Sequence, residues 1–198
     1  MGVIKTALEI ALEKTENVKS DKSGIDQFKA KQHGKKLANA FLSGEEDMSV
    51  KSFVEKINNT PGEQKESLKQ GIFDILISQI ILPAEQEDEK RFGKIGEGLK
   101  AIINNKQFNA LYEQLAQVFS QYLQEASHYE QAIRQQYSPR LRQKEEELSR
   151  RLGREVRIDP MQDPEFVAFY NQHMNALKSN YEPVIEQAKE EVRIMFNG

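Results

Sequence analysis

Glu125 and His128 are the two residues whose types and spacing come nearest to a known metal-binding pattern. A Glu-x-x-His pair places a carboxylate and an imidazole on one helix face, as in di-iron carboxylate bundles, which need two such pairs and further inward-facing glutamates. This chain offers one pair, and at 100° per residue His128 points away from the apolar stripe of its helix. The sequence therefore favours a solvated histidine and no metal site.

The remaining histidines do not complete a metal or catalytic set. His173 lies between Tyr170 and Leu177 on an apolar helix face, which favours a packed ring, and His33 lies among lysines and glutamines. Three scattered histidines without any cysteine cannot form a zinc motif of recognisable spacing. The lack of cysteine also excludes thiol nucleophiles and disulfides.

Three glycines, Gly93, Gly96 and Gly98, could suggest a phosphate-binding loop. Such a loop follows a strand and opens a helix, whereas these glycines fall inside an amphipathic helical stretch, where they favour close helix packing. The chain has no Gly-x-Ser-x-Gly sequence and no clear strand to carry a nucleophile. We therefore single out no catalytic residue and no cofactor, which favours a protein without enzymatic activity and leaves an unusual enzyme as the alternative.

One helix face is polar but almost uncharged, which is unusual for an open solvent face. It lies opposite the core stripe of the longest predicted helix and comprises Gln114, Gln117, Gln121, Gln124, His128, Gln131 and Gln135. Burying amides costs less than burying charges. We predict that this face meets a second copy of the chain, forming a homodimer, or meets another protein. The alternative is that glutamine is simply a good helix former.

A second function remains open because aromatic residues recur on the two longest predicted helices. A small-molecule pocket between these helices would be lined by Tyr112, Tyr122, Tyr129, Tyr170, His173 and Tyr181. A third option, which the charge pattern disfavours, is a nucleic-acid-associated factor using the basic segment 140–157. That segment mixes arginines with glutamates, and the net charge of the chain is −3.

The elements that must position these residues are almost all helical. Apolar residues at helical spacing predict helices over residues 3–19 and 25–42, separated by a turn at 20–24, and a short helix capped by Ser49. Thr60-Pro61-Gly62-Glu63 resembles a capping box, and the helix that it opens, 61–82, is apolar on nearly every side. We expect this helix to be central and to end or kink at Pro83.

The last half of the chain predicts a long antiparallel helical hairpin. A stripe of apolar residues runs from residue 107 to a stop at Gly153, and Pro139 leaves open whether this helix is continuous. Asp163-Pro164 then caps a last helix that continues towards residue 197, interrupted or kinked at Pro183. Because the loop between the two helices is short, we expect them to fold back on each other.

Together these patterns predict an all-α, multi-helix bundle with a long C-terminal hairpin. We divide it into an N-terminal helical segment, 1–59, packing on a helical body, 60–198, which contains the central helix 61–82 and the hairpin 107–197. The most apolar window is shorter than the roughly 20 residues that a membrane span needs. Without a recognisable signal peptide, the expected location is the cytoplasm.

Overall fold

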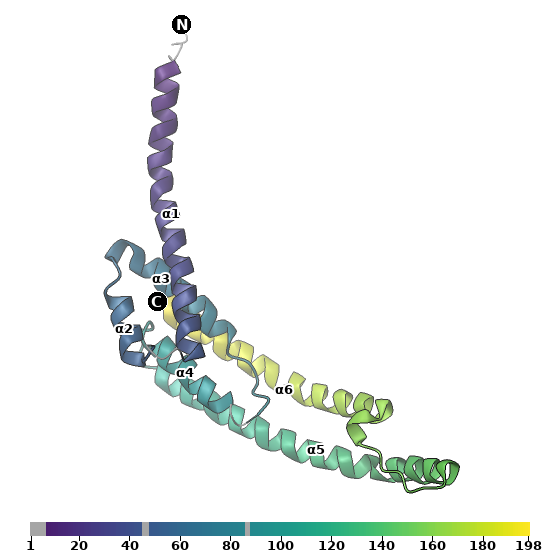
Figure 1. Ribbon diagram of the computed structural model, residues 1–198. Helices are drawn as coiled ribbons and strands as arrows, with labels where there is room; N and C mark the ends of the chain where they lie inside the picture. Colours follow the sequence, from purple (N-terminus) through teal and green to yellow (C-terminus); the bar gives the residue numbers. More distant parts are fainter. Residues whose placement is uncertain (1–6, 45–47, 86–87) are drawn as a thin grey trace. The chain divides into compact units, whose positions relative to one another are not determined.

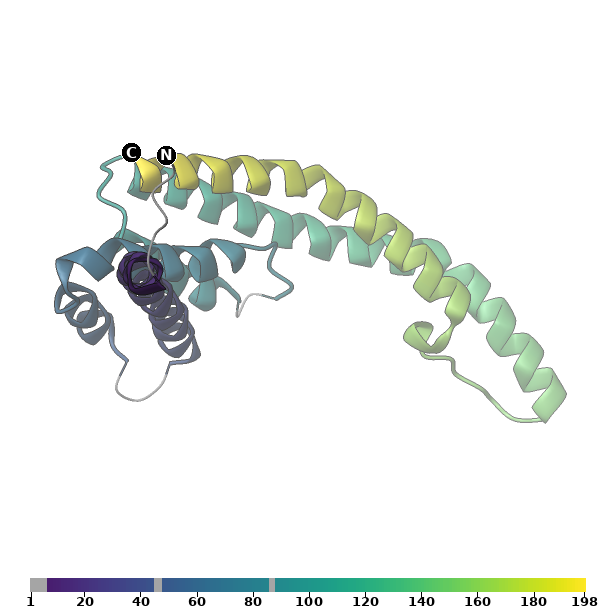
Figure 2. The same cartoon turned by 90° about the horizontal axis from the view of Figure 1, so that it is seen from above.

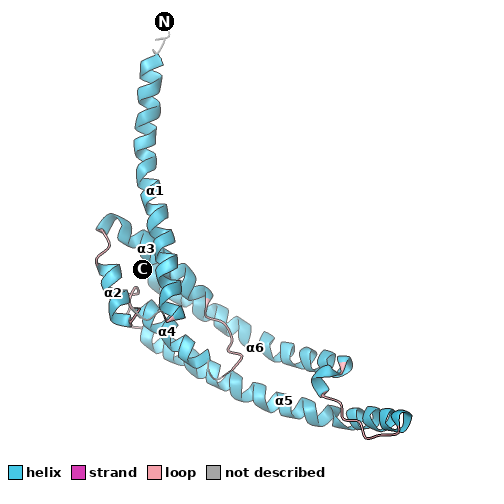
Figure 3. Ribbon diagram, viewed as in Figure 1, coloured by secondary structure: helices cyan, strands magenta, loops and turns pink. Residues whose placement is uncertain are grey.

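The computed structural model describes residues 7–44, 48–85 and 88–198, and side chains from residue 24 onwards. Every regular element within these ranges is helical, as Figure 3 shows. The chain forms two compact units, Met1–Ile80 with Arg91–Asn105, and Ile81–Lys90 with Lys106–Gly198.

The first unit is built on a close crossing of α1 (Ala7–Ser43) and α3 (Gly62–Ser78), visible in Figure 1. A glycine from each helix lies at this crossing. A Cβ atom added to Gly34 would lie 2.1 Å from the Leu68 carbonyl oxygen, and one added to Gly71 would lie 2.0 Å from the Lys31 carbonyl oxygen. The two backbones can approach this closely because neither glycine carries a side chain.

A charged cluster lies beside this crossing. The Lys31 Nζ is 2.9 Å from the Asp74 Oδ2, the Lys35 Nζ is 3.9 Å from the same atom, and the Gln70 amide donates to the Asp74 Oδ1 at 2.9 Å. Partial burial raises the pKa of Asp74, but the bonds from Lys31 and Gln70 outweigh it and leave the pKa below its usual range. The cluster joins α1 to α3 beside the two glycines.

The short helix α2 (Val50–Asn58) and α4 (Asp88–Lys100) complete the first unit, to which most of α4 belongs. As predicted, the Ser49 side chain accepts a hydrogen bond from the Ser52 N–H, at 3.1 Å, and so caps α2. Phe53 stacks on Phe41 of α1 with ring centroids 4.4 Å apart. Gly98 is a packing glycine, because a Cβ there would lie 2.8 Å from a Leu76 methyl carbon.

Three local expectations for the first unit are wrong. The central helix expected over residues 61–82 ends at Ser78, before it reaches Pro83, because the Gln79 and Ile80 N–H groups close tighter turns onto the Leu76 and Ile77 carbonyls. The turn expected at 20–24 does not form, because α1 runs unbroken from Ala7 to Ser43 and passes through Gly24. The capping box is also absent: Thr60 donates its hydroxyl hydrogen to the Lys56 carbonyl, and Pro61, which cannot cap through its side chain, precedes α3. The predicted helix over residues 3–19 lies partly outside the described residues.

The second unit is the hairpin of α5 (Phe108–Leu152) and α6 (Pro164–Asn197), which lie side by side in Figures 1 and 2. Each helix buries one stripe of apolar side chains. Near the hairpin tip, Ile133 and Tyr137 of α5 pack against Phe166 of α6. The long antiparallel pair predicted for residues 107–197 is confirmed.

Both helices of the hairpin pass through an internal proline, Pro139 in α5 and Pro183 in α6. Each proline lacks an N–H group and so leaves one backbone carbonyl, four residues earlier, without its helical partner. The prolines and the residues four positions before them, Gln135 and Ser179, are all exposed. Water can therefore bond these carbonyls, so the helix continues where the sequence allowed a break.

The connection between α5 and α6 folds back on the end of α5. Gly153 ends α5 with a positive φ of 64°, as the predicted stop requires. The Val156 N–H donates to the Ser149 hydroxyl and the Ile158 N–H donates to the Glu145 carboxylate, both at 2.9 Å. A single helical turn, η1 (Pro160–Gln162), follows, and Asp163 then caps α6 through the Glu165 N–H.

The predicted all-α class is confirmed for the described residues. In α3, Leu68, Ile72 and Leu76 are fully buried, and the central place expected for this helix stays a prediction. None of the described helices carries an apolar stretch long enough to cross a bilayer. The domain boundary expected between residues 59 and 60 stays a prediction. In the structure α1 and α3 belong to the same compact unit, because the paired glycines bring these two helices together.

Candidate functional site

The glutamine face predicted on α5 is exposed at all seven positions. Its members are separated by three and four residues in strict alternation: Gln114, Gln117, Gln121, Gln124, His128, Gln131 and Gln135. This spacing is the 3.5-residue repeat of a coiled-coil seam, and it spans about 32 Å of helix at 1.5 Å per residue. We refer to these seven residues as the glutamine stripe.

Two charged residues border the glutamine stripe at its ends. Glu113 precedes it, and Arg134 lies 21 residues, or three heptads, further on, so the two share one position of the repeat. Both side chains are exposed. The Arg134 guanidinium also contacts the Glu130 carboxylate of its own helix at 2.9 Å, an exposed pair of the kind that contributes little to stability.

The second unit also contains a groove of about 680 Å³. Three segments line it: residues 82–85 with Glu89, α5 between Ser120 and Glu130, and α6 between Tyr170 and Lys178. The size falls within the range of small-molecule sites. Four residues singled out from the sequence, Tyr122, Gln124, His128 and Tyr170, are therefore brought to one cavity.

Tyr122 lies in the wall of this groove and is only 3% exposed. Its ring packs edge-on against Tyr181, with centroids 5.2 Å apart, and its hydroxyl makes no hydrogen bond to another described residue. No fully buried side-chain oxygen or nitrogen among the described residues lacks a partner, so the small exposed part of Tyr122 includes its hydroxyl. Burial, followed by the neighbouring Tyr170 and Glu182, raises the pKa of Tyr122.

Other polar side chains around the groove also lack partners among the described residues. They include three amides, one imidazole, two carboxylates and one ammonium: Gln124, Asn171, Asn175, His128, Glu85, Glu89 and Lys178. Glu130, in contrast, is paired with Arg134. The pocket predicted from the sequence did not include the two asparagines, Lys178 or the two glutamates. That prediction followed the recurrence of aromatic residues along the helices, and these five exposed residues are not aromatic.

The other members of the predicted aromatic pocket lie elsewhere. Tyr112 packs on Phe108 with ring centroids 5.4 Å apart, His173 packs edge-on against Phe169 at 4.5 Å, and Tyr129 is 45% exposed. Tyr181 packs against Tyr122 and does not line the groove. Burial and a hydrogen bond to the Glu125 carboxylate raise the pKa of Tyr181 to about 12.

The Glu125 carboxylate is therefore already hydrogen-bonded to Tyr181, and it also accepts a hydrogen bond from the Gln121 amide at 3.3 Å. His128, its partner in the Glu-x-x-His pair, is exposed. Across the described residues, no three histidine, aspartate or glutamate side chains gather closely enough to hold a metal ion.

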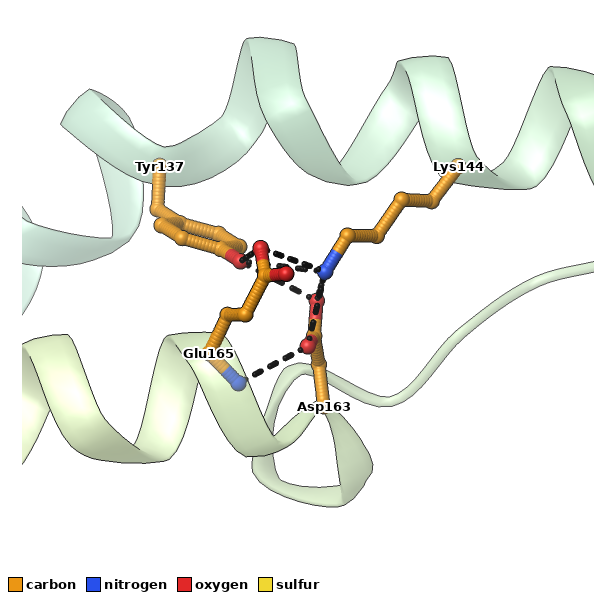
Figure 4. A network of polar contacts seen from close by, with 4 residues as sticks. All are labelled: Tyr137, Lys144, Asp163 and Glu165. Carbon is orange, nitrogen blue, oxygen red and sulfur yellow. Dashed lines mark hydrogen bonds and ion pairs between the residues drawn. The ribbon is translucent and has the colours of Figure 1, made fainter.

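A polar network that the sequence did not reveal ties the hairpin together near its tip (Figure 4). The Lys144 ammonium of α5 lies 2.8 Å from Asp163 and 2.9 Å from Glu165, both at the start of α6. The Tyr137 hydroxyl donates to the Asp163 carboxylate at 3.2 Å. No spacing rule could predict this network, because its members are brought together by the returning loop.

The network shifts the ionisation of all four groups. The Lys144 ammonium holds the pKa of Asp163 and of Glu165 below their usual range, and these carboxylates raise the pKa of Lys144. Burial and the Asp163 carboxylate raise the pKa of Tyr137. Because each group is already paired, we interpret the network as a structural tie between α5 and α6.

The basic segment 140–157, the basis of the nucleic-acid option, lies on the last turns of α5 and the returning loop. Two of its arginines are paired with acids of the same segment: Arg150 with Glu146 at 3.5 Å, and Arg157 with Glu155 at 3.1 Å. Such pairs are typical of a solvated helix and reduce the charge that a phosphate backbone would meet.

Comparison with known proteins yields one match. The model of a family described as "Family of unknown function (DUF6657)" matches residues 54–194, a range that contains the glutamine stripe, the groove and the tip network. No curated protein and no solved structure matches the chain.

Proposed function

Since the chain belongs to DUF6657, a family of unknown function, we propose its role from its own geometry: a non-enzymatic interaction protein of the cytoplasm that pairs with a second copy of itself through the glutamine stripe. The single observation that carries this proposal is the exposed seven-residue seam on α5, which contains no lysine, arginine, aspartate or glutamate. An ordinary solvated helix mixes lysines and glutamates on its exposed face, whereas this seam has neither.

The spacing of the stripe supports helix pairing. Residues that repeat every 3.5 positions stay on one side of a gently supercoiled helix, so all seven can face the same partner helix. Amide side chains can donate and accept hydrogen bonds across such a seam, which offsets their loss of water. A polar seam specifies pairing at a cost in stability, so we expect a weak dimer that forms at high micromolar concentration.

The border charges favour an antiparallel pair. Glu113 and Arg134 occupy the same heptad position at opposite ends of the stripe. When two copies of α5 run in opposite directions, Glu113 of each copy faces Arg134 of the other, which gives two complementary contacts. A parallel pair would bring neither residue to an opposite charge.

We expect the double variant Gln117→Glu/Gln131→Glu to weaken self-association by at least about tenfold, because it places four like charges in the seam of the dimer. Both positions lie outside the groove. Sedimentation equilibrium over a concentration series measures the change. Gln136→Glu, an exposed residue of the same helix outside the stripe, is the matched control and should leave self-association unchanged.

Charge exchange at the border tests the direction of pairing. Glu113→Arg alone and Arg134→Glu alone should each weaken the dimer, and the double exchange should restore it, because the antiparallel contacts are then rebuilt with reversed signs. A wild-type chain that remains monomeric at high micromolar concentration would refute the proposal. A dimer that is insensitive to the stripe variants would do the same.

A second candidate function, small-molecule binding, is favoured by the groove and by the partnerless Tyr122 hydroxyl in its wall. A thermal-shift screen with acidic, basic, zwitterionic and neutral metabolites tests it. At least one class of metabolite should raise the melting temperature of the wild-type protein. The same metabolites should raise that of the Tyr122→Phe variant much less. If no class raises it, this candidate is refuted.

A further inference from the structure

We propose that the groove of the second unit binds a small zwitterion, an amino acid or a short peptide with a free amine and a free carboxylate. The inference rests on the second candidate function and names its ligand class. It begins from the distribution of charge around the groove, where acids and the single lysine come from different segments.

The acidic side of the groove is formed by the segment that connects α3 to α4 and by the first turn of α4. Glu85 lines the cavity from the connecting segment and Glu89 from α4, and neither carboxylate is paired with another described residue. Two unpaired carboxylates at one side of a cavity favour an ammonium group there. Glu130 adds little to this charge, because Arg134 already neutralises it.

The opposite sign comes from α6. Lys178 lines the groove without a partner among the described residues, and Asn171 and Asn175 precede it by seven and three positions, on the same side of the helix. An ammonium group flanked by amide N–H donors suits a carboxylate. A ligand carrying one charge of each sign therefore complements both sides, whereas a simple cation or anion meets one like charge.

Tyr122 supplies a contact in the wall that does not depend on charge. The Tyr122 side chain is only 3% exposed, and its hydroxyl has no hydrogen-bond partner among the described residues. Such a hydroxyl can donate to a peptide carbonyl or a carboxylate and can accept from an amide or ammonium. Leu82, Leu123 and Met174 add apolar surface for a ligand side chain.

Isothermal titration of the full chain with L-alanine, dialanine and trialanine tests the proposal, since these three zwitterions separate their charges by increasing distances. We expect saturable binding of at least one of them. Acetylating the amine, or converting the carboxylate to an amide, should each weaken that binding by roughly tenfold, because each change removes a charge-assisted contact.

The variants assign each end of the ligand. Glu85→Gln/Glu89→Gln should abolish the difference between the free and the acetylated peptide, and Lys178→Met should abolish the difference between the carboxylate and the amide. Tyr122→Phe should weaken the unmodified peptide about threefold to tenfold and leave the ring packing in place. The matched controls are Glu63→Gln/Glu97→Gln, which removes two exposed carboxylates outside the groove, and Lys106→Met, which removes one exposed ammonium group outside it. Both should leave the affinity unchanged.

Three results would overturn the inference. The first is the absence of saturable binding for all three zwitterions, and the second is equal weakening by the groove variants and their matched controls. The third is a thermal-shift response confined to another chemical class and lost with Tyr122→Phe, in which case the groove is still a binding site but its ligand is not a zwitterion.

Discussion

Replacing Gly71 with alanine is expected to lower the free energy of unfolding of the first unit by roughly 3 kcal/mol. The new Cβ would lie 2.0 Å from the Lys31 carbonyl oxygen, far inside van der Waals contact, and the obstructing atom belongs to the backbone of α1. Neither helix can yield by rotating a side chain, so α1 and α3 must move apart along their shared core.

The sign of this effect is the opposite of what helix propensity predicts. Alanine is better than glycine in a helix interior by about 1 kcal/mol. Gly24, which lies in α1 with nothing within 4 Å of an added Cβ, isolates that gain. Gly24→Ala should therefore be neutral or slightly stabilising, whereas Gly34→Ala should resemble Gly71→Ala, because its Cβ would lie 2.1 Å from the Leu68 carbonyl.

Urea unfolding followed by circular dichroism measures the stability changes, and hydrogen exchange locates them. Amides of α1 and α3 should lose protection in Gly71→Ala, and amides of the hairpin helices should keep theirs, since the helix crossing belongs to the first unit. If Gly71→Ala proves as stable as Gly24→Ala, the backbones of α1 and α3 do not approach each other closely at Gly71.

The glycine crossing also shows where sequence reasoning stops. Periodicity correctly predicts that α3 is buried, because apolar residues surround it from Ile72 onwards. It cannot predict which helix lies against Gly71, since that depends on a contact between residues some forty positions apart. Gly34, within a lysine-rich stretch, carries no local sign that it is one half of the same crossing.

In two other places the local sequence suggested a break in a helix, and the helix continues in the structure. Gly24 and its polar neighbours suggested a turn, yet α1 continues, because a single glycine costs a helix only about 1 kcal/mol. Pro139 left the continuity of α5 open, and the helix continues because solvent reaches the carbonyl that loses its partner.

For the candidate site, the sequence predicts the residues of the helices better than those of the connections. The glutamine stripe follows from helical periodicity alone, so all seven positions share one face as expected. Glu85 and Glu89 could not be placed at the groove, because the path of the segment between α3 and α4 is not encoded in any period. Lys144 and Asp163, 19 positions apart, meet only after the loop turns back.

Replacing Asp163 with alanine is expected to destabilise the hairpin by about 2 kcal/mol, through two losses of similar size. The Asp163 side chain caps α6 by accepting from the Glu165 N–H, and a lost cap costs about 1 kcal/mol. The second loss is that of the Asp163 carboxylate from the polar network, at a cost of about 1 kcal/mol. Lys144 and the Tyr137 hydroxyl, on a side chain only 3% exposed, would both lose Asp163 and keep only Glu165 as a carboxylate partner.

Asp163→Asn removes the negative charge and keeps the helix cap, because asparagine caps helices as well as aspartate does. Its effect therefore reports the ion pair with Lys144, which is one-third exposed and so partly screened by solvent. We expect Asp163→Asn to be less destabilising than Asp163→Ala. Glu155→Gln, which removes an exposed pair with Arg157, should change stability little.

The pH dependence follows from the direction of the pKa shifts. Asp163 and Glu165 have lowered pKa values in the folded chain, so their contribution is complete above the ordinary carboxyl pKa of about 4 and is lost as the pH falls through the lowered values. Lys144 has a raised pKa, so its contribution is complete below the ordinary lysine pKa of about 10.4 and is lost above it.

The wild-type hairpin should thus lose stability on the acid side, and Asp163→Asn should show a shallower acid loss, since it has one fewer depressed carboxyl group to protonate. Urea unfolding at a series of pH values between about 2 and 7 measures both slopes, with hydrogen exchange of the first turn of α6 as the local readout. Identical acid slopes for the two proteins would mean that Lys144 does not stabilise the Asp163 carboxylate, and the tie at the hairpin tip would then depend on the helix cap and Tyr137 alone.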